Sequence, residues 1–112
     1  MIRVIVASAL LLLLTGCISG VPVAVTNGST VAITNVTVTG KGVSERVGAI
    51  SPGATETIRV RPRVATAIRV AFEAEGQRYS ATTDIEIEND EIYSVVATFS
   101  AERSLTIGTR SR

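Results

Sequence analysis

The chain has 112 residues, with 11 Lys and Arg against 10 Asp and Glu, and it contains one Cys and no His or Trp. This near-neutral balance argues against nucleic acid as the main partner, because binding to a phosphate backbone is driven by an excess of basic side chains. The single Cys excludes an intramolecular disulfide, and the absence of His removes the most common general base and a frequent metal ligand.

The N-terminal segment has three zones in the order of a secretory signal peptide. Arg3 supplies a positive charge, Val4 to Leu14 is an apolar stretch, and Thr15-Gly16-Cys17 ends the segment with small side chains. The apolar stretch has about 11 residues, fewer than the roughly 20 that a bilayer-spanning helix needs. A transmembrane segment and an ordinary cleaved signal followed by a free Cys are the two alternatives.

Leu14-Thr15-Gly16-Cys17 resembles the lipobox of bacterial lipoproteins, in which an apolar residue and two small residues precede a Cys. The resemblance covers this N-terminal segment alone. It implies that Leu14, Thr15 and Gly16 are recognised by a signal peptidase, that residues 1–16 are removed, and that Cys17 carries fatty acids such as palmitate. Several acyl chains on one residue would hold the protein stably in a lipid bilayer.

The residue after Cys17 indicates which membrane the anchor would enter. The resemblance implies inner-membrane retention when Asp stands there, and this chain has Ile18 instead. We therefore expect a lipid-anchored protein of the cell envelope, in the outer membrane and facing the periplasm. Residues 17–20 would form the acylated Cys and a short tether, residues 21–100 a β-sandwich domain, and residues 101–112 a polar C-terminal tail.

Alternating apolar residues and turn signals predict three strands in the first half of the domain. These strands are Val21–Thr26, Val31–Thr39 and Val43–Ile50, with turns at Asn27-Gly28-Ser29 and Gly40-Lys41-Gly42. Within the second strand the apolar residues Val31 and Ile33 occupy odd positions, whereas Val36 and Val38 occupy even positions. This change predicts a bulge or bend at Thr34–Asn35.

Two further strands follow, and a hairpin turn joins the second of them to a third. Ser51-Pro52-Gly53 is a turn before the strand Thr55–Arg61, and Ala65–Glu73 is the clearest strand, with Ile68, Val70 and Phe72 facing inward. Glu75-Gly76 is typical of a two-residue hairpin turn. Such a turn would pair Ala74 with Gln77, Glu73 with Arg78 in an exposed ion pair, and Phe72 with Tyr79 on the core side. The same register would turn Tyr79, Ala81, Thr83, Ile85 and Ile87 inward.

Tyr93 to Phe99 forms the last clear strand, and Ser104 to Ile107 is a candidate for a short extra strand before an end that we expect to fray. Seven short β segments without helical periodicity predict an all-β fold, a small antiparallel sandwich. The pattern resembles immunoglobulin-like and fibronectin-III-like bacterial domains. The Cys–Trp–Cys core of true immunoglobulin domains is missing, so no family function transfers.

Two groups of charged residues are candidate sites. Arg59, Arg61, Arg63 and Arg69 predict a basic face for an anionic ligand or an acidic partner, because Arg binds phosphates and carboxylates bidentately; a solvated face is the alternative. Asp84, Glu86, Glu88, Asp90 and Glu91 form an acidic segment. A solvated face is again the alternative to a calcium site, since the segment lacks the EF-hand pattern.

No catalytic residue and no metal or cofactor site is predicted, because neither a nucleophile–base pair nor a phosphate-binding glycine loop is recognisable. We therefore expect a non-enzymatic lipoprotein with a structural or adaptor role, anchored in the bilayer by Cys17 and bound to a protein partner in the envelope. The alternative is a binding module for an anionic envelope ligand, lipopolysaccharide or peptidoglycan.

Overall fold

A computed structural model describes residues 20–89 and 92–111 of the chain. The predicted signal peptide, the signal-peptidase recognition residues Leu14, Thr15 and Gly16, and the acylation site Cys17 lie outside the described residues, as do Asp90 and Glu91.

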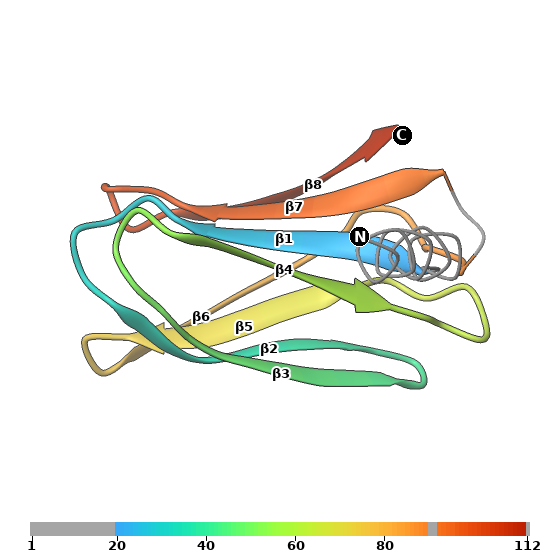
Figure 1. Cartoon of the computed structure of the whole chain (residues 1–112), viewed down its shortest axis with the longest axis horizontal. Coiled ribbons are helices and arrows are strands. Elements are labelled where there is room, and N and C mark those ends of the chain that lie inside the picture. The colour runs from blue at the N-terminus through green and yellow to red at the C-terminus, as the bar shows by residue number, and fades with distance from the viewer. Residues whose placement is uncertain (1–19, 90–91, 112) are drawn as a thin grey trace, which may run out of the picture.

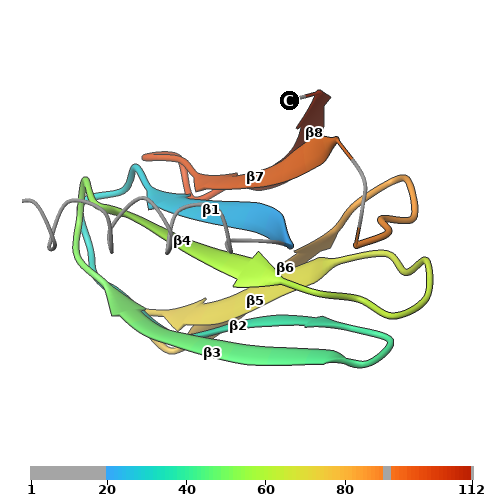
Figure 2. The same cartoon turned by 45° about the vertical axis from the view of Figure 1, so that its right-hand side comes forward.

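The described residues form eight strands that pack as two sheets (Figures 1 and 2). The strands are β1 (Val21–Asn27), β2 (Ile33–Gly40), β3 (Val43–Ile50), β4 (Thr55–Val60), β5 (Arg69–Ala74), β6 (Gln77–Thr82), β7 (Tyr93–Phe99) and β8 (Leu105–Ser111). One sheet has the order β4-β1-β7-β8 and the other β3-β2-β5-β6. The all-β sandwich expected from the sequence is thus confirmed.

The two sheets contain one parallel pair. β1 pairs with β7 in parallel, with Val23 opposite Val95, whereas the other strand neighbours are antiparallel. The sequence predicted an antiparallel sandwich and did not reveal this pair, because a parallel pair needs a long crossover between its strands. Here the crossover consists of the strands β2 to β6.

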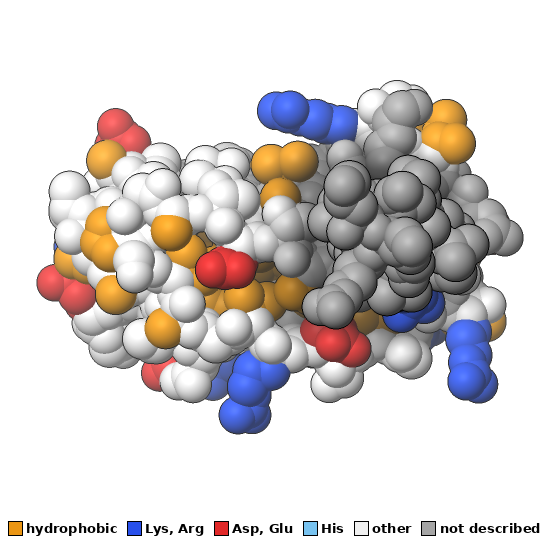
Figure 3. Space-filling model, viewed as in Figure 1, with side chains coloured by type: hydrophobic (Ala, Val, Ile, Leu, Met, Phe, Trp, Pro, Cys, Tyr) orange, Lys and Arg blue, Asp and Glu red, His pale blue; other side chains and the backbone are white. Residues whose placement is uncertain are grey.

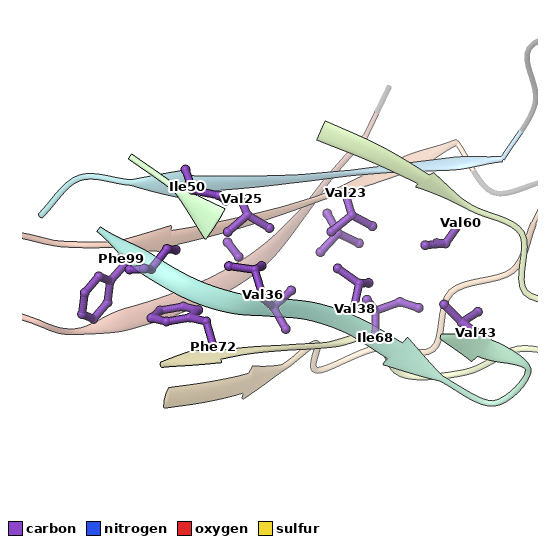
Figure 4. Packing of buried hydrophobic residues seen from close by; sticks show 14 of the residues in the cluster. Val23, Val25, Val36, Val38, Val43, Ile50, Val60, Ile68, Phe72 and Phe99 are labelled. Carbon is purple, nitrogen blue, oxygen red and sulfur yellow. The ribbon is translucent and has the colours of Figure 1, made fainter. Parts of the chain in front are cut away.

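The core lies between the sheets, and alternate residues of facing strands fill it (Figure 4). β1 shows the pattern most regularly, since Val21, Val23 and Val25 are fully buried and the residues between them are partly exposed. β-branched side chains suit this arrangement because they pack well on a pleated surface. Without a disulfide in the described chain, this packing is the main source of stability for the fold.

Three aromatic rings meet at one end of the core. The ring centroid of Phe99 lies 4.9 Å from that of Phe72 and 4.8 Å from that of Tyr79, in edge-to-face geometry. Phe72 and Tyr79 stack on neighbouring strands with their centroids 5.6 Å apart. Such arrangements are favoured by the aromatic quadrupole, and here they join the two sheets.

The hairpin between β5 and β6 has the predicted register. Phe72 lies opposite Tyr79 and Glu73 opposite Arg78, and both turn residues, Glu75 and Gly76, have positive φ. Two consecutive positive φ values define a type I′ turn, whose twist matches that of the flanking strands. The ion pair expected between the described residues Glu73 and Arg78 is not formed; the carboxylate of Glu73 instead accepts a hydrogen bond of 2.7 Å from the side-chain amide of Asn35 on β2, which the sequence did not predict.

The predicted irregularity at Thr34–Asn35 is also confirmed. The register between β2 and its neighbours shifts between Ile33 and Thr37, and Asn35 has a φ of 53°. Asn adopts this left-handed conformation more readily than most residues. The bulge lets Ile33 and Val36 both enter the core despite their different parity.

Three segments differ from the prediction. The strand expected from Ala65 begins only at Arg69. The stretch expected to be a polar tail holds β8, which pairs with β7 along its whole length, from Leu105 to Ser111. Ile85, expected to face inward, is 40% exposed, because β6 ends at Thr82 and the hydroxyl of Thr83 donates to the carbonyl of Ile85, turning the chain.

Candidate functional site: the tether end of the sandwich

The chain enters the sandwich at Gly20, which is buried against the end of β4. A Cβ atom at Gly20 would lie 2.8 Å from the carbonyl oxygen of Val60 and 3.1 Å from Cγ of Arg61. Its φ of 102° is also one that favours glycine. The guanidinium of Arg59 donates a hydrogen bond of 3.3 Å to the carbonyl oxygen of Gly20. The entry point of the chain is therefore fixed to the body of the domain.

We call the end of the sandwich around Gly20 the tether end. It comprises the start of β1, the turn between β2 and β3, the β4–β5 loop (residues 61–68) and the β6–β7 loop (residues 83–92, of which 90–91 are not described). These segments gather at the right-hand end of Figure 1.

Thr66 connects three of these segments. Its amide donates 3.1 Å to the carbonyl of Ile87, and the amide of Ile87 donates 2.8 Å to the carbonyl of Thr66. Its hydroxyl accepts a hydrogen bond of 2.9 Å from the amide of Lys41, in the turn between β2 and β3. Thr66 is 3% exposed, and its bond to Lys41 is partly buried. The loops of the tether end are thus held to one another.

Large apolar side chains are exposed at this end. Among the described residues, Val64 is 56% exposed, Ile92 60% and Ile85 40%, and all three lie in the two loops of the tether end. Figure 3 shows apolar and basic side chains at this end, beside the atoms that are not described. The sequence did not single out Val64 or Ile92 as exposed. Each stands beside charged residues in a stretch without strand alternation, and this pattern could have indicated their exposure.

Strand register places Val64 and Ile92 on either side of the entry point. Val21 lies opposite Val60 in the antiparallel pair with β4, so the β4–β5 loop leaves the sheet beside Gly20 and reaches Val64 three residues after Arg61. Val23 lies opposite Val95 in the parallel pair with β7, which brings Ile92, immediately before β7, beside Gly20 on the other flank.

Charges of both signs surround these apolar side chains. Lys41, Arg61 and Arg63 are exposed at the tether end, and so are Asp84, Glu86 and Glu88 of the predicted acidic segment. Within residues 20–89 and 92–111, no three acidic or other metal-ligating side chains gather closely enough to hold a metal ion.

The predicted basic face is divided between the two sheets. Arg59 projects from the outer side of β4, where its neighbour Val60 faces the core. Arg69 projects from the outer side of β5, where Val70 faces the core. The outer sides of two packed sheets point in opposite directions, so these two arginines cannot contact one small ligand together. Arg61 and Arg63 belong to the loop at the tether end, and the four arginines share an end of the molecule but not a face.

The outer edge of β8 is a second candidate for recognition. β8 is the last strand of its sheet, and its seven residues, Leu-Thr-Ile-Gly-Thr-Arg-Ser, contain a single charge, at Arg110. In an antiparallel edge strand, every second residue directs its backbone N–H and C=O away from the sheet. The opposite sheet has two edge strands: β3 is interrupted by a register shift and by Gly48, whose φ is 95°, and β6 is one residue shorter than β8 and also carries a single charge, at Arg78.

No pocket is found in the described part of the domain. Among the described residues there is no helix that is long and apolar enough to cross a membrane.

Comparison with known proteins concerns the fold. Neither a protein-family model nor a curated protein sequence matches the chain. A protein from Eubacterium rectale, whose structure was determined by NMR, superposes with a TM-score of 0.56, covering 83% of this chain and 88% of its own, at 10% sequence identity. The two chains share a fold. An identity this low extends the likeness no further than the arrangement of the strands.

Proposed function

We propose that the protein is a non-enzymatic lipoprotein of the cell envelope, anchored in a bilayer through acylated Cys17, whose sandwich binds a protein partner. The proposal for the anchor rests on Leu14-Thr15-Gly16-Cys17, the match to the lipobox. Cys17 lies three positions before the buried Gly20, and three residues span at most about 10 Å. The domain would stay next to its membrane, the outer membrane in our proposal, on the periplasmic side.

The observation that carries the binding role is the edge of β8. A nearly neutral seven-residue edge strand offers backbone donors and acceptors to an extended segment of another protein. Edge strands of this kind are commonly protected by charges, prolines or bulges, and β8 has only Arg110. A partner strand added to β8 would extend the sheet β4-β1-β7-β8 by one strand.

The anchor is tested by metabolic labelling with a fatty-acid probe and by mass spectrometry of the N-terminal peptide. We expect label in the native chain, a mature chain that begins at Cys17, and no label in Cys17→Ala. An unlabelled native protein that keeps Met1 would overturn the anchor.

The partner is tested by cross-linking in intact cells, with photo-reactive residues placed on the edge strand. Thr106 and Gly108 are exposed on β8, and a Cβ atom at Gly108 meets no atom within 4 Å. Gly108→Lys should therefore leave the fold intact while its charge opposes strand addition. We expect one cross-linked protein from Thr106, lost in Gly108→Lys and retained in Thr57→Lys, the matched change on the other edge strand of the same sheet.

The runner-up, binding of an anionic envelope ligand, predicts a different result. The purified domain would then bind lipopolysaccharide or peptidoglycan, and replacement of Arg59, Arg61 and Arg69 by Ala would abolish that binding. The separation of Arg59 and Arg69 on opposite outer sides favours the partner proposal over this one.

A further inference from the structure

The tether end presents Val64 and Ile92 to solvent on either side of the entry point, whereas the large apolar side chains outside its two loops are buried or partly buried in the described sandwich. Isolated exposed apolar residues are common on soluble proteins and need no explanation. Here, however, the exposed large apolar side chains of the described residues, with Ile85, all belong to the two loops at one end. The feature to be explained is that these exposed side chains gather in the loops that flank Gly20.

The length of chain before Gly20 determines what lies opposite this end. If Cys17 is acylated, as proposed above, its acyl chains enter the bilayer and about 10 Å of extended chain at most separates it from Gly20. Because Gly20 is packed against Val60 and bonded to Arg59, the domain cannot move away by unwinding its first strand without losing those contacts. The loops that flank Gly20 must then lie within reach of the lipid headgroups.

We infer that the tether end rests on the bilayer, with the side chains of Val64 and Ile92 in the headgroup interface and the neighbouring Arg63 at lipid phosphates. This inference rests on the proposed anchor. The bonds between Thr66, Ile87 and Lys41 hold the loops in place, so little conformational freedom is lost when they meet the surface. Val64 follows Arg63 directly, and this order of a cationic and an apolar residue suits the boundary between phosphates and acyl chains.

The tether end also carries Ile85 and charges of both signs. Ile85 is 40% exposed, less than Val64 at 56% and Ile92 at 60%, and we place it at the rim of the contact. Five basic side chains lie at this end, and Asp84, Glu86 and Glu88 offset three of them; the five are Lys41, Arg59, Arg61, Arg63 and Arg69. Burial of the apolar side chains of Val64 and Ile92 does not depend on lipid charge, so we expect the contact on zwitterionic as well as on anionic bilayers.

The test uses the full lipidated chain, purified from membranes and reconstituted in vesicles of phosphatidylcholine, with and without phosphatidylglycerol. An environment-sensitive fluorophore is attached to a single new thiol in Val64→Cys, Ile92→Cys or Glu102→Cys. Glu102 is exposed in the turn between β7 and β8, at the far end of the sandwich, and serves as the matched control. Quenching by lipids with a spin label near the headgroup reports contact with the bilayer.

We expect a fluorescence increase of roughly twofold or more, and lipid quenching, at positions 64 and 92 and not at 102, in both lipid compositions. If the protein floats with the vesicles but positions 64 and 92 behave as 102 does, docking is overturned and the anchor stands. If the protein fails to float and its N-terminal peptide is unmodified, the anchor is overturned, and the docking inference falls with it. The double variant Val64→Ser/Ile92→Ser should still float with the vesicles. On vesicles, the amides of residues 61–68 should exchange hydrogen faster in this variant than in the native protein.

Discussion

The side-chain amide of Asn27, at the end of β1, donates a hydrogen bond of 3.0 Å to the carbonyl oxygen of Ile50, the last residue of β3 in the other sheet. The same nitrogen donates 2.7 Å to the carbonyl of Val31, and the amide oxygen accepts from both the backbone and the hydroxyl of Ser29. Asn27 is fully buried, and every polar atom of its side chain has a partner. One residue thus fixes two chain segments that cross between the sheets.

Replacement of Asn27 by Ala should destabilise the domain by about 3 kcal/mol, because the carbonyl of Ile50 and the carbonyl of Val31 each lose a donor and the backbone amide of Ser29 loses its acceptor. Chemical denaturation followed by circular dichroism measures the change in the free energy of unfolding. Thr30→Ala, an exposed change in the same loop, is the control and should cost less than about 0.5 kcal/mol. Equal stabilities of the two variants would show that the network does not support the crossing.

The aromatic cluster predicts a large difference between two ring substitutions. Phe99→Ala should cost about 4 kcal/mol, because it removes a fully buried ring and both of its edge-to-face contacts. Tyr79→Phe keeps its ring and loses only an exposed hydrogen bond of 3.3 Å to Gln77, so its cost should be below about 0.5 kcal/mol. The denaturant midpoints of the two variants, measured side by side, test this difference. A loss of stability in Phe99→Ala as small as that in Tyr79→Phe would contradict the packing of the Phe99 ring.

Gly20→Ala should destabilise the start of β1 more than Gly42→Ala destabilises the turn between β2 and β3. Both glycines have positive φ, but a Cβ atom at Gly20 would lie 2.8 Å from a backbone oxygen, whereas Gly42 has no atom within 4 Å. Gly42→Ala therefore measures the backbone strain alone, about 1 kcal/mol. Hydrogen exchange of the β1 amides should rise in Gly20→Ala, and exchange equal to that of Gly42→Ala would refute the close packing at Gly20.

Two substitutions at Asn35 separate the backbone conformation from the hydrogen bond at the bulge of β2. Asn35→Gly keeps a residue suited to φ of 53° and loses the bond to Glu73, which lies at an exposed site and contributes about 0.5 kcal/mol. Asn35→Ala loses the bond and adds strain, so it should be less stable than Asn35→Gly by about 1 kcal/mol. Thermal unfolding of both variants gives the difference, and the reverse order would contradict the assignment.

Local patterns predicted those parts of the fold whose geometry is set by neighbouring residues. The turn Glu75-Gly76 fixed the pairing of Phe72 with Tyr79, because a two-residue loop leaves one register. The parity change between Ile33 and Val36 revealed the bulge, since both residues had to reach the core. The strand β8 was recognised only in part, because an edge strand with one partner shows weaker apolar alternation than a central one.

The sequence by itself determined the alternation that makes two-sided strands, the hairpin register and the lipobox match at Cys17, because each depends on residues close together in the chain. The tertiary structure decided the parallel pairing of β1 with β7 and the separation of Arg59 from Arg69. It also brought Val64 and Ile92 to the entry point of the chain. These relations join segments far apart in sequence, and they are selected when the two sheets close over a shared core, which no local pattern encodes.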